Sequence, residues 1–318
     1  MPPFTKTKLI IAGIGGVGGY FGGLLAKHYS NSESVEVNFV ARGQHLAEIQ
    51  EKGLTVIKGE TPFVARPKMA TDQPSEIGKA DIILICTKSY DLENVLQQLE
   101  PCIHEGTILL PLLNGIEGKE RIEQYFPNNL VLDGCVYIVS RLKQAGVIEN
   151  SGNIQTLYFG NNQAKIDKLV ELEQLFKAAN IEANYVQNSA QIIWEKFIFL
   201  SPIASVTSYY DKSVGEIISN DESFATAKSL IEEVVRLANA KNNSFSDDIV
   251  EKTIAKFQSL PYETTSSMHN DFKNGKSTTE LSSLTAYVIS ECENYGLPSP
   301  TYSKLYAELA LKSGVMNL

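Results

Sequence analysis

The strongest constraint on the fold is a glycine-rich stretch near the N-terminus, "LIIAGIGGVGGYFGG", which runs from Leu9 to Gly23. Seven of the eleven residues from Gly13 to Gly23 are glycine. The stretch follows an apolar run, precedes a helical pattern, and contains the motif G-x-G-x-x-G as Gly13, Ile14, Gly15, Gly16, Val17 and Gly18. In a strand–turn–helix context this motif is typical of dinucleotide binding.

Each glycine of the motif has a physical role in such a site. Gly13 permits a tight turn, Gly15 lets backbone N–H groups approach a pyrophosphate, and Gly18 allows close packing of helix and strand. The phosphates then lie at the positive end of the helix dipole. The alternative is a glycine-rich turn that serves packing alone, but position and context favour the nucleotide interpretation.

The first half of the chain alternates between strand-like and helix-like segments, which predicts a mostly parallel sheet with helical crossovers. Apolar strand-like runs are Lys8–Ile14, Val35–Ala41, Ala80–Thr87, Gly106–Leu113 and Asn129–Val139, with further candidates at Val147–Asn150, Gln155–Phe159 and Glu182–Val186. Helical patterns lie at Val17–Tyr29, Gln44–Lys52, Tyr90–Leu99, Gly118–Phe126 and Ala164–Ala179.

After about residue 188 the patterns are helical only: Ala190–Ser208, Val214–Lys241, Asp247–Ser259, Glu280–Tyr295 and Tyr302–Lys312. We therefore expect an α/β protein with two domains. We expect residues 1–188 to form an N-terminal parallel-sheet domain that carries the dinucleotide motif, and residues 189–318 to form an all-helical domain.

The end of the second strand indicates which dinucleotide binds. An acidic residue there bonds the ribose 2′-hydroxyl of NAD, whereas an arginine accommodates the 2′-phosphate of NADP. This strand ends "NFVARGQHL", with Arg42 and no acid. We therefore predict NADP(H), with an ordinary surface arginine as the alternative.

Composition limits the partners. The formal net charge is −9, which disfavours nucleic acid and anionic membranes, and no apolar run has the length of a membrane helix. The four cysteines form no C-x-x-C pair, and the four histidines show no metal-binding spacing. We expect a cytoplasmic protein with reduced thiols, no metal, a small-molecule substrate, and a homodimer as one candidate assembly.

Two charged residues in apolar surroundings are candidate catalytic groups. Lys196 shares a helix face with Ile193 and Leu200, so desolvation would lower its pKa and suit it to donate a proton. The alternative is a lysine whose ammonium reaches solvent. Glu280 stands three residues after Ser277, a capping-box spacing, so it either caps its own helix or serves the site.

The chain resembles the ketopantoate reductase (2-dehydropantoate 2-reductase) family over nearly its whole length. The matching pieces are the glycine motif, "ARGQHL" (41–46), "CTKSYD" (86–91), "LLNGIEG" (112–118), "WEKF" (194–197), "SSM" (266–268) and "TELSSL" (279–284). The resemblance implies that residues 1–188 form an NADP-binding Rossmann domain and that residues 189–318 form a helical substrate and catalytic domain. It also implies NADPH-dependent reduction of a 2-oxo acid to a 2-hydroxy acid. With 2-dehydropantoate as the first substrate to test, the product would be pantoate and the pathway pantothenate biosynthesis.

The resemblance also implies residue roles. Lys196 would protonate the forming alkoxide, and Glu280 would bond a substrate hydroxyl. The remaining roles fall on Asn114 beside nicotinamide and substrate, Lys88 near the cofactor, Ser267 on the substrate, and Arg42 on the 2′-phosphate. With this support, the desolvated interpretation of Lys196 outweighs the solvent-exposed one.

Three positions depart from the family pattern: Leu200, Ala204 and Val214 stand where the family has asparagines. An apolar pocket would pair poorly with a hydroxyl-rich substrate. The alternatives are therefore a reductase for a more apolar 2-oxo acid, an opine-type dehydrogenase, or a non-catalytic NADP-binding module.

Overall fold

The computed structural model describes residues 6–161, 166–243 and 245–313. The chain divides into two compact units. The first comprises residues 1–113 and 118–189, and the second comprises residues 114–117 and 190–318. The short segment Asn114–Glu117 therefore groups with the helices of the second unit, although it lies within the range expected for the first domain.

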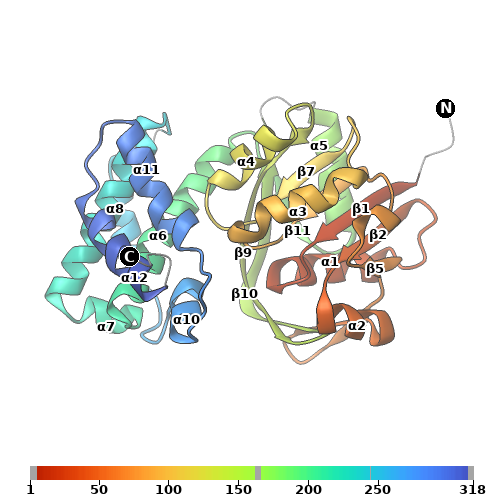
Figure 1. The fold of residues 1–318 in the computed structure, drawn as a ribbon, viewed down its shortest axis with the longest axis horizontal. Helices are drawn as coiled ribbons and strands as arrows, with labels where there is room; N and C mark the ends of the chain where they lie inside the picture. Colours follow the sequence, from red (N-terminus) through yellow and green to blue (C-terminus); the bar gives the residue numbers. More distant parts are fainter. Residues whose placement is uncertain (1–5, 162–165, 244, 314–318) are drawn as a thin grey trace. The chain divides into compact units, whose positions relative to one another are not determined.

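The first unit is built on a six-stranded parallel sheet (Figure 1). Its order is β5-β2-β1-β6-β7-β8, and every neighbouring pair is parallel. The strands are β1 (Thr7–Ala12), β2 (Val35–Val40), β5 (Met69–Thr71), β6 (Ile82–Ile85), β7 (Ile108–Pro111) and β8 (Leu130–Val131). Because β1 is apolar at every position from Leu9 to Ala12, both faces of the sheet are covered.

Helices alternate with the strands of this unit as the sequence predicts. They are α1 (Gly16–His28), α2 (Gly43–Lys52), α3 (Leu92–Leu99), α4 (Glu117–Tyr125) and α5 (Ile166–Ala178), with 3₁₀ turns η1 (Pro74–Glu76), η2 (Ser89–Asp91) and η3 (Glu100–Cys102). Leu92, Leu96 and Leu99 of α3 bury one stripe against Ile10 and Ile83 of the sheet. The helix expected at 164–179 begins at Ile166, and residues 164 and 165 lie outside the described ranges.

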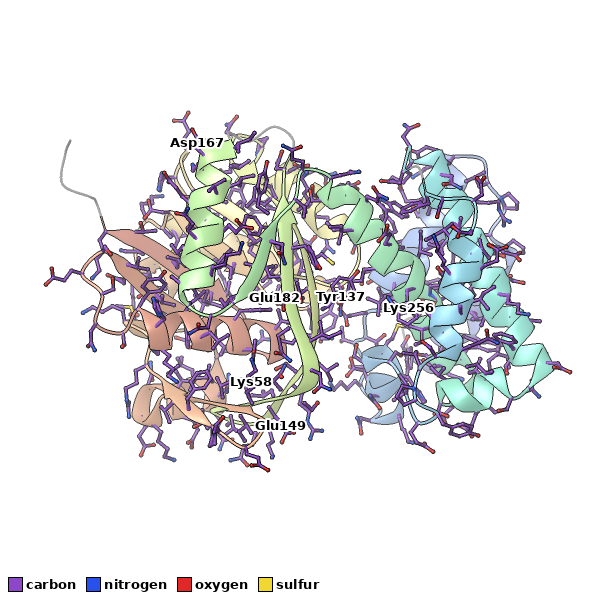
Figure 2. All side chains as sticks on the ribbon, turned by 180° about the vertical axis from the view of Figure 1, so that it is seen from behind. Lys58, Tyr137, Glu149, Asp167, Glu182 and Lys256 are labelled. Carbon is purple, nitrogen blue, oxygen red and sulfur yellow. The ribbon has the colours of Figure 1, made fainter. Side chains whose placement is uncertain are left out.

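A second, mixed sheet completes the first unit. Its strands are β3 (Leu54–Lys58), β4 (Phe63–Ala65), β9 (Asp133–Gln144), β10 (Val147–Gly160) and β11 (Glu182–Tyr185). The long strand β10 pairs with β3 and β11 in parallel and with β9 as an antiparallel hairpin. Charged side chains such as Lys58 and Glu149, labelled in Figure 2, lie on this sheet.

Helix α1 packs against both sheets, and its glycines make this possible. A Cβ on Gly19 would lie 2.5 Å from the side chain of Ile148 in β10, and one on Gly22 would lie 3.1 Å from Ile11 in β1. A Cβ on Gly23 would meet Val56 of β3 at 2.7 Å. The glycines beyond the motif are therefore packing residues.

The prediction of one strand over Asn129–Val139 is wrong. The segment forms β8, which pairs with β7, and then β9, which pairs with β10 in the other sheet. The change occurs at Gly134, where a Cβ would lie 2.0 Å from the carbonyl oxygen of Pro111. The two runs at 147–150 and 155–159 instead form the single strand β10, and the short strands β3, β4 and β5 were not predicted.

The described part of the second unit is helical, which confirms the predicted fold class of a Rossmann domain followed by a helical domain. The elements are α6 (Ser189–Tyr210), α7 (Val214–Ile218), α8 (Asp221–Ala240), α9 (Ile249–Gln258), α10 (Ser267–Lys273), η4 (Ser282–Ala286), α11 (Tyr287–Asn294) and α12 (Pro300–Lys312). The prediction of a single helix over Val214–Lys241 is wrong. Helix α7 ends at Ile218, and Asn220 caps the start of α8 by accepting a hydrogen bond from Ser223 N at 3.0 Å.

Buried hydroxyl groups connect the helices of this unit. Ser201 in α6 donates to the carbonyl of Leu284 at 2.6 Å and shares a 2.6 Å hydrogen bond with the hydroxyl of Tyr302 in α12. Burial raises the pKa of the Tyr302 phenol. Within the described ranges, no helix has both the length and the apolarity needed to cross a membrane.

Candidate active site

The glycine motif lies where the parallel sheet changes direction. Chain progression runs outward from β1 to β2 on one side and from β6 to β7 on the other, so β1 and β6 flank the topological switch point. Gly13 follows β1 with φ +94°, and a Cβ there would lie 3.0 Å from backbone atoms of Cys86 and Thr87 after β6. Ligands of open α/β sheets bind at this position, outside the carboxyl ends of the strands.

The other motif glycines divide into an open position and packed ones. A Cβ on Gly15 would meet no atom within 4 Å, and Gly15 is the N-cap of α1 without a side-chain cap hydrogen bond. By contrast, a Cβ would lie 2.2 Å from the Ser140 carbonyl oxygen at Gly16 and 2.0 Å from the Gly13 carbonyl oxygen at Gly18. The open helix start at Gly15 fits a pyrophosphate, and the residues present therefore fit a dinucleotide.

Arg42 and Lys88 lie on the same unit as the glycine motif. Arg42 is the N-cap of α2, its side chain is 76% exposed, and its guanidinium donates to the Asp91 carboxylate at 3.0 Å. Asp91 N donates to the backbone carbonyl oxygen of Lys88 at 3.0 Å. Asp91 therefore bonds to the Arg42 side chain and to the Lys88 backbone. Sequence analysis gave Asp91 no role, because nothing in the motif "CTKSYD" indicates a pairing with residue 42.

His45 joins the glycine motif to a distant turn. Its Nε2 lies 2.7 Å from the carbonyl oxygen of Ile14, and its Nδ1 accepts a hydrogen bond from Gly146 N at 2.8 Å. Burial lowers the pKa of this imidazole, and the Ile14 carbonyl opposes the shift. Sequence analysis missed His45 as a site residue, because both of its partners are backbone atoms far away in the sequence.

In the second unit, Lys196 and Asn114 are in contact. Lys196 is half-buried on α6, and its Nζ donates to the Asn114 side-chain carbonyl at 3.1 Å. Gly115 follows with φ +97°, and a Cβ there would lie 3.5 Å from Ser283 of η4. The side-chain oxygen of Asn114 in the "NG" motif thus accepts a hydrogen bond from the candidate proton donor, and Gly115 lies against the helical segment that follows Glu280.

Glu280 is buried at 1% exposure immediately before the helical segment that contains η4 and α11. Its carbonyl oxygen accepts hydrogen bonds from Leu284 N at 3.0 Å and from the Ser283 hydroxyl at 3.2 Å. A capping box would require Glu280 inside the first helical turn. Because the helix begins at Leu281, this position does not match the capping-box spacing from Ser277.

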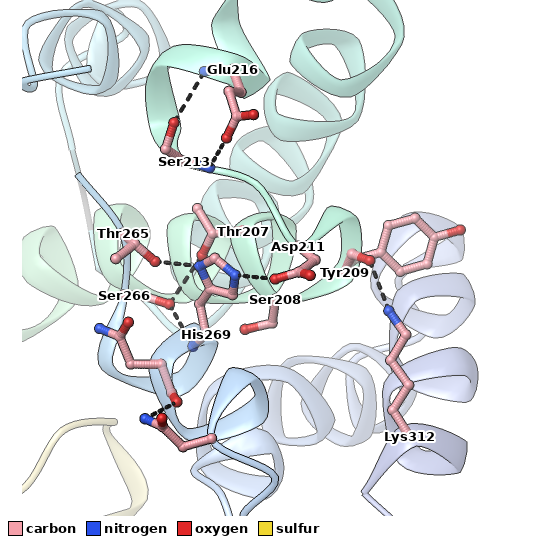
Figure 3. A network of polar contacts seen from close by, with 12 residues as sticks. Thr207, Ser208, Tyr209, Asp211, Ser213, Glu216, Thr265, Ser266, His269 and Lys312 are labelled. Atoms are coloured by element: carbon pink, nitrogen blue, oxygen red, sulfur yellow. Dashed lines mark hydrogen bonds and ion pairs between the residues drawn. The ribbon is translucent and has the colours of Figure 1, made fainter. Parts of the chain in front are cut away.

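Ser267 is exposed at the start of α10, a helix that sequence analysis did not predict. A polar network holds this helix start (Figure 3). Ser266 caps α10 through a bond from His269 N at 3.0 Å, and His269 Nε2 lies 2.7 Å from the Asp211 carboxylate. His269 also contacts the Thr265 hydroxyl, and its imidazole holds the pKa of Asp211 below the ordinary value.

The three residues at which the resemblance implies asparagines, Leu200, Ala204 and Val214, differ in their surroundings. Ala204 and Val214 are 1% and 0% exposed and belong to the core of the helical unit. Leu200 is half-buried and follows Lys196 by one helical turn on α6. Of the three, Leu200 is the residue whose side chain is accessible enough to contact a substrate.

Comparisons with known proteins cover both units. The family model described as "Ketopantoate reductase PanE/ApbA" matches residues 9–164, and its C-terminal counterpart matches residues 188–313. A solved structure of 2-dehydropantoate 2-reductase from Porphyromonas gingivalis W83 is 35% identical with a TM-score of 0.84, covering 96% of this chain and 100% of that one.

Curated relatives are more distant. An uncharacterized oxidoreductase of Bacillus subtilis, YkpB, is 27% identical over 96% of this chain and 98% of its own length. A 2-dehydropantoate 2-reductase of Halobacterium salinarum is 26% identical over 94% of this chain and 96% of its own length.

The fold and the glycine-rich strand–turn–helix define a dinucleotide-binding protein with a separate helical domain. This class alone leaves many reactions open. The chain belongs to the ketopantoate reductase PanE/ApbA family and is an oxidoreductase that acts on CH–OH groups. The family thereby resolves the earlier alternative of a non-catalytic module in favour of an enzyme.

Proposed function

We propose that this protein reduces a 2-oxo acid to a 2-hydroxy acid with NADPH, and that 2-dehydropantoate, reduced to pantoate for pantothenate biosynthesis, is its substrate. Family membership over both units supports the reaction class. The observation that carries the proposal is the 3.1 Å hydrogen bond from Lys196 Nζ to the Asn114 side chain. This bond holds the ammonium group of a lysine on a mostly apolar helix in a fixed position.

The ketone carbon of the substrate would accept the hydride that a bound reduced nicotinamide would supply. A positioned donor at the ketone oxygen would stabilise the negative charge that reduction places there. Lys196 would donate a proton from Nζ to this oxygen, and Asn114 would hold the ammonium through its side-chain carbonyl. The buried Glu280 would accept a hydrogen bond from a substrate hydroxyl, and the exposed Ser267 would contact the substrate.

The residues proposed to hold the cofactor are Gly13, Ile14, Gly15, Gly16, Val17, Gly18, Arg42, Lys88 and Asn114. Gly15 leaves open space at a helix N-terminus, which suits the pyrophosphate. We propose NADP(H) over NAD(H) because Arg42 carries an exposed guanidinium after β2, and a guanidinium binds a phosphate bidentately.

Leu200 supports a second candidate substrate class, the more apolar 2-oxo acids. Its side chain is half-buried one turn beyond Lys196, on the same face of α6. An apolar side chain there cannot pair with a substrate hydroxyl, and an unpaired buried hydroxyl costs about 1–3 kcal/mol. An opine-type dehydrogenase is the third candidate, and it would need an amine as co-substrate.

The test is NADPH oxidation with 2-dehydropantoate, apolar 2-oxo acids, and each of these with an added amine. We expect turnover without amine and a fall of about a hundredfold or more in kcat for Lys196→Ala. Lys252→Ala is the matched control, because Lys252 lies in the same unit and pairs with Asp248 at 3.0 Å. Preference for an apolar acid would reassign the substrate, and undiminished turnover by Lys196→Ala would remove the lysine from the mechanism.

We further propose a cytoplasmic location and a homodimer. Cell fractionation tests the first, and light scattering of the purified protein tests the second. Recovery in a membrane or exported fraction, or a monomeric mass at working concentration, would contradict these proposals.

A further inference from the structure

The His45 imidazole connects two backbone segments that are remote in sequence. Its Nε2 lies 2.7 Å from the Ile14 carbonyl oxygen within the glycine motif. Its Nδ1 accepts from Gly146 N at 2.8 Å, in the turn between β9 and β10. All three residues belong to the first unit.

The two partners define the protonation state of the ring. A backbone N–H can only donate and a carbonyl can only accept, so Nδ1 carries no proton and Nε2 carries one. His45 is therefore neutral and held in a single tautomer. The burial that lowers its pKa favours the same state.

The bond to Ile14 has a geometric consequence for the next peptide group. The carbonyl of Ile14 and the N–H of Gly15 belong to one planar, trans peptide and point in opposite directions. When His45 holds the carbonyl oxygen, the N–H of Gly15 points away from His45. Gly15 is also the N-cap of α1, where a Cβ would meet no atom within 4 Å.

The opposite end of the imidazole is anchored to a turn that charged side chains stabilise. Glu149 of β10, labelled in Figure 2, accepts from Arg141 at 2.6 Å and from Lys143 at 2.5 Å, both on β9. These bonds hold the pKa of Glu149 below its ordinary value. The same hairpin contacts the glycine motif again, because the Ser140 carbonyl lies against Gly16.

His45 also belongs to the helix that presents Arg42. Arg42 is the N-cap of α2, and its carbonyl oxygen accepts from Leu46 N at 3.3 Å. The first turn of α2 thus contains the candidate 2′-phosphate ligand and the residue that holds the Ile14–Gly15 peptide.

We propose that His45 is a positioning residue for the cofactor's pyrophosphate: it fixes the Ile14–Gly15 peptide so that the Gly15 N–H is available to a phosphate oxygen. This inference rests on the proposed binding of NADP(H) at the glycine motif. In this proposal His45 acts through the peptide rather than by direct contact with the cofactor.

The test measures dissociation constants by calorimetry for two ligands, NADPH and adenosine 2′-monophosphate. The second ligand has the 2′-phosphate that Arg42 is proposed to bind, but it has no pyrophosphate. We expect His45→Phe to weaken NADPH by about tenfold or more, the effect of one lost charge-assisted hydrogen bond, and to change the 2′-monophosphate less than threefold. His45→Gln keeps an N–H donor for Ile14 and should stay within about threefold of wild type.

Two further variants separate the bond to Ile14 from a general loss of structure. His45→Asn keeps an acceptor for Gly146 but does not reach Ile14, so it should weaken NADPH as His45→Phe does. His104→Phe is the matched control, because His104 Nδ1 also accepts from a glycine N–H, that of Gly106 at 3.0 Å. If His45→Phe does not fold, the contrast between the glutamine and asparagine variants still decides the matter.

Unchanged NADPH affinity in the phenylalanine and asparagine variants would overturn the inference, as would equal losses for both ligands. A wild-type protein that binds NADPH but reduces no 2-oxo acid would contradict the proposed reaction and leave the role of His45 intact. A wild-type protein that binds no dinucleotide would overturn both.

Discussion

Adding a methyl group at Gly15 should weaken cofactor binding, whereas adding one at Gly18 should lower the stability of the fold, because the two glycines have different surroundings. A Cβ on Gly15 meets no atom within 4 Å, and its φ of −84° suits alanine. Alanine is a poorer N-cap than glycine but restricts the unfolded chain, and these effects have opposite signs. Gly15→Ala should therefore change the free energy of unfolding by less than about 0.5 kcal/mol.

The methyl group of Gly15→Ala would occupy the open space where a phosphate must approach the helix start. Loss of one charge-assisted hydrogen bond corresponds to about 1.5–3 kcal/mol, or roughly a tenfold to hundredfold weaker NADPH complex. At Gly18 the added Cβ would lie 2.0 Å from the Gly13 carbonyl oxygen and 2.8 Å from the Cys86 Cβ. A backbone oxygen cannot rotate away, so Gly18→Ala should destabilise the protein by about 2–3 kcal/mol.

Urea denaturation and NADPH fluorescence titration measure the two effects separately. Gly59→Ala is a useful control, because Gly59 has φ +59° in a turn outside the motif and its substitution should lower stability without weakening NADPH. NADPH affinity within twofold of wild type for Gly15→Ala would refute the ligand role of that glycine. Wild-type stability of Gly18→Ala would refute the packing argument.

Three further outcomes are expected. Arg42→Ala should raise the KM for NADPH about tenfold or more and leave the KM for NADH unchanged. Asp91→Asn removes the carboxylate that pairs with the Arg42 guanidinium, so it should lower the KM for NADPH. Equal effects on the KM of both cofactors would exclude a 2′-phosphate role for Arg42. Tyr302→Phe should lower the free energy of unfolding by about 1–2 kcal/mol, measured by denaturation, because the buried Ser201 hydroxyl loses a 2.6 Å partner. Because folding lowers the pKa of His45 from its ordinary 6.5, the folded state binds fewer protons than the unfolded chain once the pH falls below about 6.5. Wild type should therefore lose stability relative to His45→Gln as the pH falls through this range. Melting temperatures that change in parallel with pH for the two proteins would contradict this.

The glycine motif was predictable because its spacing reflects local geometry. Gly13 does make a turn with positive φ at the end of β1, and Gly18 packs against that turn. Alternation of apolar runs and helical patterns was sufficient to predict the parallel sheet, since strands buried on both faces are continuously apolar.

The features that the sequence did not reveal depend on contacts between distant residues. The chain leaves the first sheet at Gly134 because the Pro111 backbone lies against it, and no local pattern records this. His45 bonds to backbone atoms 31 and 101 residues away, and Arg42 pairs with Asp91 across 49 residues. Backbone partners leave no mark on residue identity, so such contacts require the folded structure.

The candidate catalytic residues show both cases. The position of Lys196 on an apolar helix was visible from the pattern, whereas its 3.1 Å bond to Asn114 was not. The two interpretations of Glu280 could not be separated by spacing alone. The structure buries Glu280 one residue before the helix begins, a place that does not match the capping box.

The central claim, that Lys196 supplies the proton during reduction of a 2-oxo acid, is tested most directly by single-turnover kinetics. Wild type and Lys196→Ala are loaded with NADPH and mixed with saturating 2-dehydropantoate, and the decay of NADPH fluorescence is followed. We predict a rate at least about a hundredfold lower in the variant, with an unchanged dissociation constant for NADPH. A single-turnover rate within threefold of wild type would contradict the account.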